Sequence, residues 1–396
     1  MKATMYLKTS HKLFCPGPVN VAENVRQVVS TMEIGHREKE FSSLFKSVNS
    51  KLLDVFEIRE QSRYQSVIIT GSGSASNEAV LSSVVGQKNI LVISNGEFGQ
   101  RLGDISRIHN PNTFQIKLEW GVPFNISEIR KFVKNNKIAM ISMVHHETST
   151  GMLNPISKVG KIVKEFGLMF HVDAVSSAGA DKIDIEDSNI DFLTTSSSKA
   201  LGSIPGLSIV IGKNKSFESI KDIPPRTAYL NLYKFYRYAK DVKQTPNTPA
   251  VQLFGALEQA LSNILVNRVE NVRADLRKKA LLIRKTLKQM DIHPLLDSKH
   301  QLSSMLTTFS LPDYLLASDL KNALKSLGFV IYEGKGPLKD KVFQIACIGE
   351  ITFDQIQEFK EAFETVINQY KTPSKQLLSN NSNHVSRFKD NSSMYN

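Results

Sequence analysis

Two residues of this chain have the chemistry of a covalent catalytic site, the amine of Lys199 and the carboxylate of Asp173. An amine can bond covalently to an aldehyde, and a fixed carboxylate can keep a pyridine nitrogen protonated so that the ring accepts electrons. Each residue follows a short apolar run, 191–195 or 169–172, that predicts a buried strand. Because ligands of open α/β sheets bind where the strands end, this pair predicts a pyridoxal phosphate site.

A glycine- and serine-rich segment, 71–79, follows another apolar run and precedes a predicted helix. Backbone N–H groups at a helix start bind anions, and hydroxyls add further donors. The segment therefore predicts a phosphate-binding turn, with a flexible turn that binds nothing as the alternative. It lacks the third glycine of Gly-x-Gly-x-x-Gly, because position 76 is serine, so a nicotinamide cofactor is disfavoured.

Two more predicted strand ends carry aromatic or polar side chains. Phe98 follows the apolar run 90–93, where it could cover a planar ring, although packing in the core is its other interpretation. The segment 143–151 contains polar groups that an apolar interior would not tolerate unpaired. Its His-His-Glu at 145–147 does not predict a metal site, because consecutive residues of an extended chain alternate sides.

The elements that must position these residues predict an α/β protein with two domains. The chain has 396 residues, of which 41% are hydrophobic and 22% charged, as in soluble proteins with a sizeable core. Strand-like and helix-like segments alternate from 66 to 213, which predicts a mainly parallel sheet with helices on both faces. A long helical stretch is predicted from 251 to about 290, and strands with one helix follow it.

These patterns predict the domain limits. We expect an N-terminal arm at 1–15, a large α/β domain at 16–250, a small α+β domain at 251–371 and a disordered tail at 372–396. The tail is rich in Ser, Asn and Lys, a composition that buries too little apolar surface to offset the cost of ordering.

Charge and cysteine content narrow the class of partner. The net charge is +12, and without the basic tail about +9 remains dispersed, with no basic stripe that has interleaved aromatics. We therefore expect an anionic small-molecule substrate and no nucleic acid. Only Cys15 and Cys347 occur, which gives no disulfide framework and no metal site. No apolar stretch of about 18 residues is present, so we expect a cytoplasmic protein without a membrane segment.

Taken in order, the chemistry-bearing segments resemble the class V aminotransferases, which use pyridoxal 5'-phosphate and have fold type I. The segments that carry the resemblance are 14–19, 71–74, 94–99, 144–155, 172–177 and 197–199. The resemblance is strongest to members of phosphonate metabolism that take 2-aminoethylphosphonate as amino donor and pyruvate as acceptor. It implies a large, mainly parallel, seven-stranded type of sheet, a smaller C-terminal α+β domain, a ping-pong transamination and a homodimer with a shared active site.

The resemblance also implies a role for each matching residue. Lys199 would bond to the cofactor aldehyde and move the proton, Asp173 would bind the ring nitrogen, and Phe98 would stack on the ring. The other implied cofactor contacts are Ser72, Gly73 and Ser74 at the phosphate, Ser198 beside it, Ser149 near the ring oxygen or Asp173, and Thr245 at the phosphate of the neighbouring subunit. Gly17 would lie on the substrate side.

The main departure from the family is at Gln344, where an arginine usually binds the substrate carboxylate. Glutamine cannot supply a bidentate cationic fork, so the donor and acceptor stay open. Arg37 lies in a segment that resembles the anion-binding His-Arg of phosphoserine aminotransferases and is our first candidate for a replacement. Its alternative is a solvated arginine paired with Glu38. Lys335 is the second candidate.

Three other functions stay open. The segment 35–37 fits a serine or alanine:glyoxylate type of transaminase equally well. A pyridoxal phosphate lyase or desulfurase is a further possibility, although neither cysteine lies in a predicted mobile loop. A non-catalytic homologue that binds the cofactor for regulation is the third, and the intact Lys199 and Asp173 argue against it.

Overall fold

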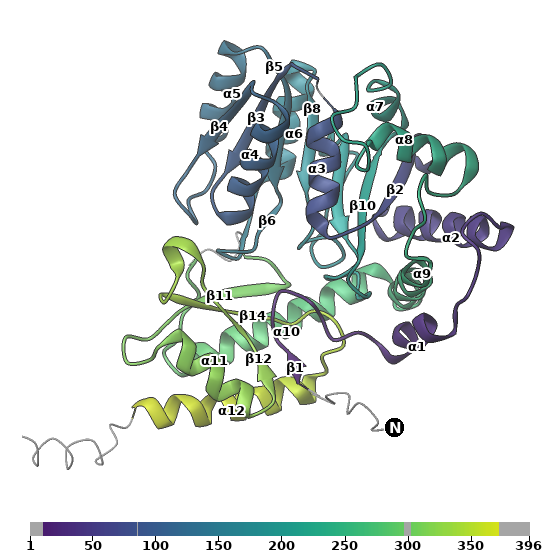
Figure 1. Cartoon of the computed structure of the whole chain (residues 1–396). Helices are drawn as coiled ribbons and strands as arrows, with labels where there is room; N and C mark the ends of the chain where they lie inside the picture. The colour runs from purple at the N-terminus through teal and green to yellow at the C-terminus, as the bar shows by residue number, and fades with distance from the viewer. Residues whose placement is uncertain (1–10, 85, 297–301, 372–396) are drawn as a thin grey trace, which may run out of the picture.

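A computed structural model describes residues 11–84, 86–296 and 302–371 of the chain. Its centre is a seven-stranded sheet (Figure 1). In spatial order the strands are β2 (Tyr64–Thr70), β10 (Leu207–Lys213), β9 (Phe192–Ser196), β8 (Met169–Asp173), β5 (Ile138–Val144), β3 (Asn89–Ser94) and β4 (Thr113–Lys117). Only β10 pairs antiparallel with its neighbours, so the predicted mainly parallel sheet is confirmed.

Helices cover both faces of this sheet because its strands are apolar on both sides. Along β2, the side chain of Ile68 enters one hydrophobic core, whereas those of Val67 and Ile69 enter another. The first core is closed by α2 (Lys39–Val55), α5 (Ile126–Asn135), α6 (Ile156–Phe166) and α9 (Val251–Val266). The second is closed by α3 (Gly73–Ser83), α4 (Glu97–His109), α7 (Asn214–Glu218) and α8 (Leu232–Arg237).

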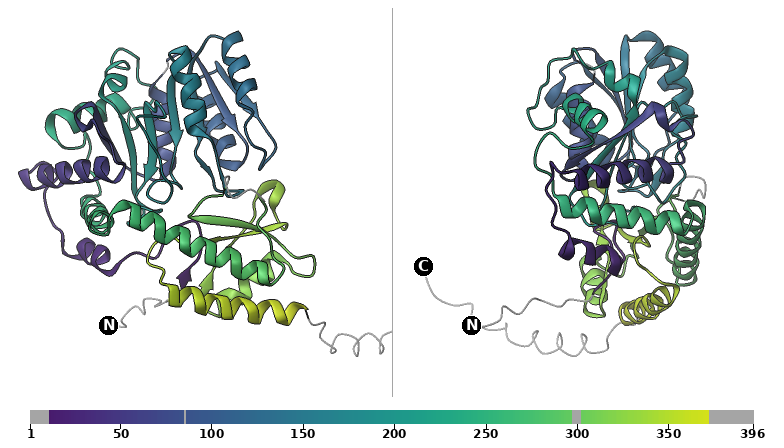
Figure 2. Two further views of the ribbon diagram at one scale, coloured as in Figure 1. Left: turned by 180° about the vertical axis from the view of Figure 1, so that it is seen from behind. Right: turned by 90° about the vertical axis from the view of Figure 1, so that its right-hand side faces the viewer.

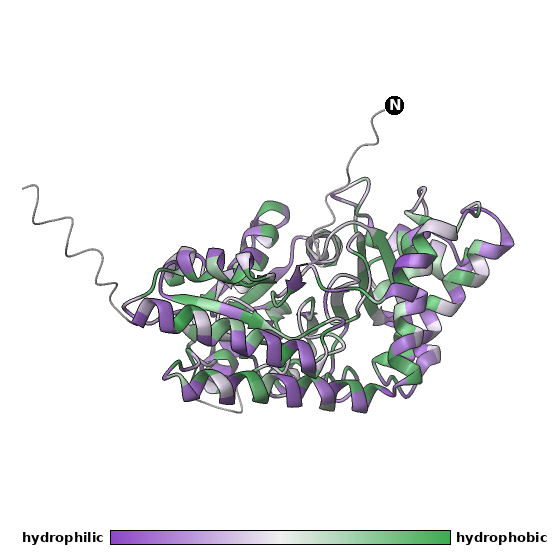
Figure 3. Cartoon of the chain, turned by 90° about the horizontal axis from the view of Figure 1, so that it is seen from below, coloured by the Kyte–Doolittle hydropathy of each residue, from purple (hydrophilic) through white to green (hydrophobic). Residues whose placement is uncertain are grey.

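A smaller α+β unit lies below the large sheet (Figure 1). Its sheet has the order β11 (Leu306–Ser310), β14 (Val342–Ala346), β13 (Tyr332–Glu333), all antiparallel. Its helices are α10 (Val269–Gln289), α11 (Ala317–Ser326) and α12 (Phe353–Lys371), the last along the outer edge (Figure 2). Seen from below, the helices of the chain carry hydrophilic and hydrophobic residues in alternation along their length (Figure 3). The buried residues of α12, such as Ile356, Phe359 and Phe363, recur at helical spacing.

The N-terminal segment joins the small unit. Strand β1 (Lys12–Leu13) pairs with β12 (Phe329–Val330), and Phe14 stacks on Phe359 with ring centroids 4.4 Å apart. Helix α1 (Glu23–Thr31) then packs on α9, where Asn24 and Asn263 exchange amide hydrogen bonds. The predicted domain limits stay a prediction, and residues 1–10 of the arm and the whole tail 372–396 lie outside the described residues.

The helical stretch predicted from 251 to about 290 is helical in the structure, with one break. The structure has two helices there, α9 and α10, which are separated at Asn267 and Arg268. Arg268 has φ +61°, a left-handed conformation that interrupts the helical hydrogen bonding. Periodicity could not reveal this break, because apolar residues recur at helical spacing on both sides of it.

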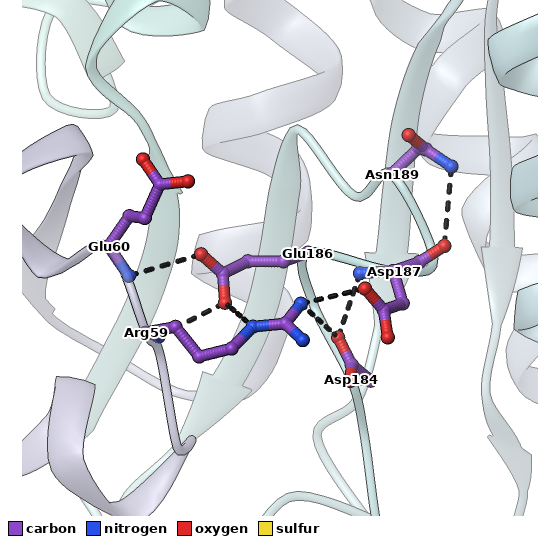
Figure 4. A network of polar contacts seen from close by, with 6 residues as sticks. All are labelled: Arg59, Glu60, Asp184, Glu186, Asp187 and Asn189. Carbon is purple, nitrogen blue, oxygen red and sulfur yellow. Dashed lines mark hydrogen bonds and ion pairs between the residues drawn. The ribbon is translucent and has the colours of Figure 1, made fainter.

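A surface ion-pair network joins the segment before β2 to the loop between β8 and β9 (Figure 4). The Arg59 guanidinium lies 2.8 Å from Glu186 and 2.7 Å from Asp187, and Asp184 is 3.6 Å away. The backbone N–H of Glu60 also donates to Glu186. These side chains are mostly exposed, so we assign the network a small, salt-sensitive contribution to stability.

In the described parts of the chain no helix is long and apolar enough to cross a membrane.

Candidate active site

The strand ends of the large sheet and the edge of the small unit enclose a cavity of about 330 Å³. Eleven of the candidate residues line it: Gly17, Ser72, Gly73, Ser74, Phe98, Ser149, Asp173, Ser198, Lys199, Lys335 and Gln344. Arg37 and Thr245 do not. Residues from three parts of the chain, near 17, between 72 and 199, and beyond 332, therefore meet at one place.

Asp173 is the last residue of β8 and is held by two donors. Its Oδ1 accepts from the Val175 N–H at 2.9 Å, and its Oδ2 accepts from Asn77 Nδ2 at 2.7 Å. Burial raises the pKa of Asp173, and these two hydrogen bonds oppose that effect only in part. A cationic N–H inside the cavity would offset the free-energy cost of burying this negative charge. A protonated pyridine nitrogen is such a group.

Lys199 lies in the turn after β9, facing Gly17. Burial lowers the pKa of Lys199 and the charge of Lys335 lowers it further, whereas the Cys15 thiol opposes this change. A lowered pKa leaves more of the amine neutral, the form that attacks an aldehyde. A Cβ at Gly17 would overlap the Lys199 amine, and Gly17 has φ +134°, so glycine is required for this close approach.

The glycine- and serine-rich segment forms the start of α3. Ser72 is the N-cap residue and Gly73 the first helical residue, so the free N–H groups of this helix end face the cavity. A Cβ at Gly73 would lie 2.8 Å from a methyl group of Val175, so only glycine leaves the cradle open. Ser198 adds a hydroxyl 3.2 Å from that of Ser196. This donor set suits a phosphate group.

Phe98 is half-buried and lies in the first turn of α4. The carboxylate of Glu147, in β6 (His146–Glu147), accepts from the N–H groups of Phe98 and Gly99 at 3.3 and 3.0 Å. The Ser149 hydroxyl donates to the same carboxylate at 2.6 Å, and its place near the ring oxygen or Asp173 stays a prediction. Burial raises the pKa of Glu147, and these hydrogen bonds oppose the rise.

Sequence reasoning missed Asn77 and Glu147 as site residues. Asn77 lies one helical turn after Gly73, a spacing that could have indicated that it shares the cavity side of α3. Glu147 follows a buried strand and precedes the polar turn, and an acidic residue that reaches a helix start is a known stabilising pattern. Neither signal identifies the partner, which only the tertiary structure supplies.

Gln344, on β14, does not point a free amide donor into the cavity. Its Nε2 donates to the Thr148 carbonyl at 2.5 Å and lies 3.2 Å from Thr308 Oγ1. The side chain therefore joins the small sheet to the turn that carries Ser149, rather than replacing an arginine.

Arg37 is not brought to the cavity of its own chain. Its guanidinium donates to the Thr245 carbonyl at 2.7 Å and to the Pro246 carbonyl at 3.1 Å, and it also binds the Gln244 side chain at 3.2 Å. The Thr245 hydroxyl donates to the Asn247 carbonyl at 2.8 Å. Arg37 thus fixes the segment that carries Thr245, whose role at the neighbouring subunit stays a prediction.

His146 is buried in the cavity wall, and neither of its ring nitrogens has a hydrogen-bond partner among the residues that the structure describes. His145 contacts the Ser177 hydroxyl at 2.9 Å instead. Burial lowers the pKa of each imidazole to about 4, so both are neutral near pH 7. Within the ranges that the structure describes, no group of three His, Cys, Asp or Glu residues could hold a metal ion.

Comparison with known proteins identifies the family. The pattern described as "Aminotransferase class-V" matches residues 21–338. An uncharacterized aminotransferase of Methanocaldococcus jannaschii is 32% identical over 85% of this chain and 87% of its own length. The 2-aminoethylphosphonate–pyruvate transaminase of Bacillus mycoides is 32% identical over 88% of this chain and 96% of its own length.

Solved structures agree on the fold. An alanine–glyoxylate aminotransferase from Nostoc sp. superposes with a TM-score of 0.87 at 25% identity, covering 93% of this chain and 98% of its own. A pyridoxamine–pyruvate aminotransferase from Mesorhizobium loti gives 0.85 at 24% identity, covering 91% and 92%. The chain belongs to the class V aminotransferases, which confirms the predicted family, fold type I architecture and enzyme class. The family implies pyridoxal phosphate as cofactor.

Proposed function

We propose that this aminotransferase binds pyridoxal 5'-phosphate in the cavity and moves an amino group from a small anionic amine, best 2-aminoethylphosphonate, to a keto acid such as pyruvate. One observation carries the proposal: the amine of Lys199 and the carboxylate of Asp173 line the same cavity, together with the N-terminus of α3. The similarity to transaminases of 2-aminoethylphosphonate over most of the chain supports this choice of donor.

The donor set of the cavity fits each part of the cofactor. The residues that would hold it are Lys199, Asp173, Ser72, Gly73, Ser74, Phe98, Ser149 and Ser198, with Thr245 of the neighbouring subunit in the homodimer that we propose. When bound, the cofactor supplies an aldehyde and an electron-accepting ring that stabilises negative charge on the reacting carbon.

The protein's own groups have separate tasks. Lys199 would hold the cofactor through its aldehyde, and the amine of Lys199 would accept and donate the proton at the substrate carbon. Asp173, oriented by Asn77, would hold the ring nitrogen and favour its protonated form. Phe98 would lie against the ring, and the Gln344–Thr148 contact would close the wall of the cavity against water.

The test is spectroscopic. Protein reconstituted with pyridoxal phosphate should be yellow, and Lys199→Ala should lose the visible band of the covalently bound cofactor. Adding 2-aminoethylphosphonate should then shift the spectrum of the wild type, and pyruvate should restore it. A colourless wild type, or no response to any primary amine, would refute the proposal.

Donor profiling decides between the remaining functions. A faster response to alanine or serine with glyoxylate as acceptor would favour the glyoxylate type, to which the Nostoc sp. structure is similar in fold. Release of pyruvate, ammonia or sulfide without an acceptor would identify a lyase or desulfurase.

The proposed homodimer is tested by measuring the molecular mass of the protein by sedimentation at micromolar concentration.

A further inference from the structure

We infer that Lys335 binds the anionic group of the amino donor, and that this donor is a primary amine with a terminal phosphonate rather than an α-amino carboxylate. The inference rests on the proposed function and adds to it the residue that sets substrate class. Three observations support it. Lys335 is the cation of the cavity without an acidic partner among the described residues, the amide of Gln344 is already hydrogen-bonded, and the backbone around Lys335 is fixed.

Lys335 is the available cation of the cavity. Among the described lining residues the cations are Lys199, Arg101 and Lys335. Lys199 is needed for the covalent bond, and Arg101 lies 3.4 Å from the Glu97 carboxylate and 5.0 Å from the centroid of the Phe98 ring. Lys335 has no acidic partner in the part of the chain that the structure describes, and it is exposed at the rim. An uncompensated positive charge beside a cavity attracts an anion.

The position usual for a carboxylate-binding arginine carries no charge here. Gln344 has its amide nitrogen on the Thr148 carbonyl, and the residue opposite it in the sheet is Tyr332. Lys335 lies three residues after Tyr332 and is exposed, whereas Gln344 is buried, so the positive charge on this side of the cavity lies farther out, at the rim. An anion bound there is separated from the carbon that reacts beside Lys199.

The backbone around Lys335 is fixed, whereas the side chain of Lys335 has no ion-pair partner among the described residues. The Lys335 carbonyl accepts from the Leu338 N–H at 2.9 Å, and Gly334 packs so closely under Leu338 that a Cβ would overlap its carbonyl. Gly336, with φ +49°, lies against the ring of Trp120, where a Cβ would be 2.9 Å from the nearest ring carbon. The only tryptophan of the chain thus contacts the loop that would bind the anion.

The chemistry of lysine favours a terminal phosphonate. An α-carboxylate lies next to the reacting carbon and is matched by the planar fork of an arginine. A phosphonate separated from the amine by two carbons is compact and doubly charged, and it reaches outward. The ammonium of Lys335, a point charge with three donors on a flexible stem, suits such a group at the rim.

The experiment compares Lys335→Met with the control Lys339→Gln. Lys339 is also exposed and lies directly after the short helix Gly336–Leu338, but it does not line the cavity. We expect Lys335→Met to lower kcat/KM for 2-aminoethylphosphonate by about 10–100-fold, mainly through KM, and to leave the uncharged donor propylamine within about twofold. Lys339→Gln should behave as wild type with both donors. Equal losses for the two donors in Lys335→Met would overturn the inference.

A second measurement does not depend on catalysis. Methylphosphonate has no amine and cannot react, but it should change the fluorescence of Trp120 saturably in wild type and in Lys339→Gln, and not in Lys335→Met. Unchanged binding in Lys335→Met, or no saturable change in wild type, would refute the role of Lys335 even if transamination is observed. Binding that depends on Lys335 in a protein that reacts with no amine would instead refute the proposed function. A wild type that prefers alanine to 2-aminoethylphosphonate would overturn the substrate class.

Discussion

Asn77 donates a hydrogen bond from Nδ2 to Oδ2 of Asp173 at 2.7 Å, and both side chains are buried. This contact couples the helix whose first turn would bind the phosphate to the strand end that would bind the ring nitrogen. One short segment of α3 thereby positions two ends of the same ligand, which explains why residues 73 and 77 belong to one site.

We expect Asn77→Ala to weaken the binding of pyridoxal phosphate about 10–100-fold, because a buried carboxylate loses a donor worth roughly 1.5–3 kcal/mol. Titration of the apoprotein with cofactor, followed by absorbance, measures the change. Ser82→Ala is the control, since Ser82 is also buried in α3 and, among the described residues, its hydroxyl bonds only to the helix carbonyl of Ala79, at 3.4 Å. Equal affinities in Asn77→Ala and Ser82→Ala would exclude the coupling.

Gly73→Ala should close the phosphate cradle, because the added methyl group would lie 2.8 Å from Val175 and obstruct the first turn of α3. Affinity for pyridoxal phosphate should fall at least about tenfold, whereas affinity for pyridoxal, which lacks the phosphate, should change little. Pyridoxal serves as the internal control in the same titration. A parallel loss for both ligands would mean that the substitution distorts the whole site.

Acid should destabilise the protein through its buried imidazoles. Burial lowers the pKa of His146 from 6.5 to about 4, so the unfolded chain binds more protons than the folded one between these values. Stability is therefore lost as the pH falls from about 6.5 to 4, by an amount on the order of 3 kcal/mol for this residue. His146→Leu should remove the contribution of this residue to the loss of stability in acid. The free energy of unfolding in urea, measured at pH 7 and at pH 4.5, would show the change.

The exposed His293 provides the control for this pH experiment. His293→Gln should keep the full acid sensitivity of the wild type, because its side chain is not buried. An identical pH dependence in His146→Leu and wild type would contradict the assignment. His145 also has a pKa lowered to about 4 by burial, so part of the acid sensitivity should remain in His146→Leu.

Gln344→Arg should improve the use of α-amino and α-keto carboxylates relative to 2-aminoethylphosphonate, by about tenfold in the ratio of kcat/KM values. The added guanidinium supplies the planar fork that glutamine lacks. Gln344→Met is the matched control, since it removes the bond to the Thr148 carbonyl without adding charge. If the methionine and arginine variants shift the ratio equally, the effect comes from the lost contact and not from the charge.

Much of the fold follows from local patterns. The buried strands ending at Asp173 and just before Lys199 are short and apolar, and they alternate with helical segments, so the parallel sheet could be predicted from the sequence. The break between α9 and α10 could not, because it depends on the left-handed conformation of one residue, Arg268, with no glycine or proline to mark it.

Local sequence patterns do not determine which side chains far apart in the chain contact one another. Residue types and their order near Lys199, Asp173 and Gly73 were sufficient to indicate the family and its cofactor chemistry, since those properties depend on short segments. The partner of Gln344, the position of Arg37 beside Thr245, and the contact of the Lys335 loop with Trp120 join residues far apart in the chain. Such contacts depend on how the two units pack, and a side chain's hydrogen-bond partner is decided only when that packing brings a donor and an acceptor together.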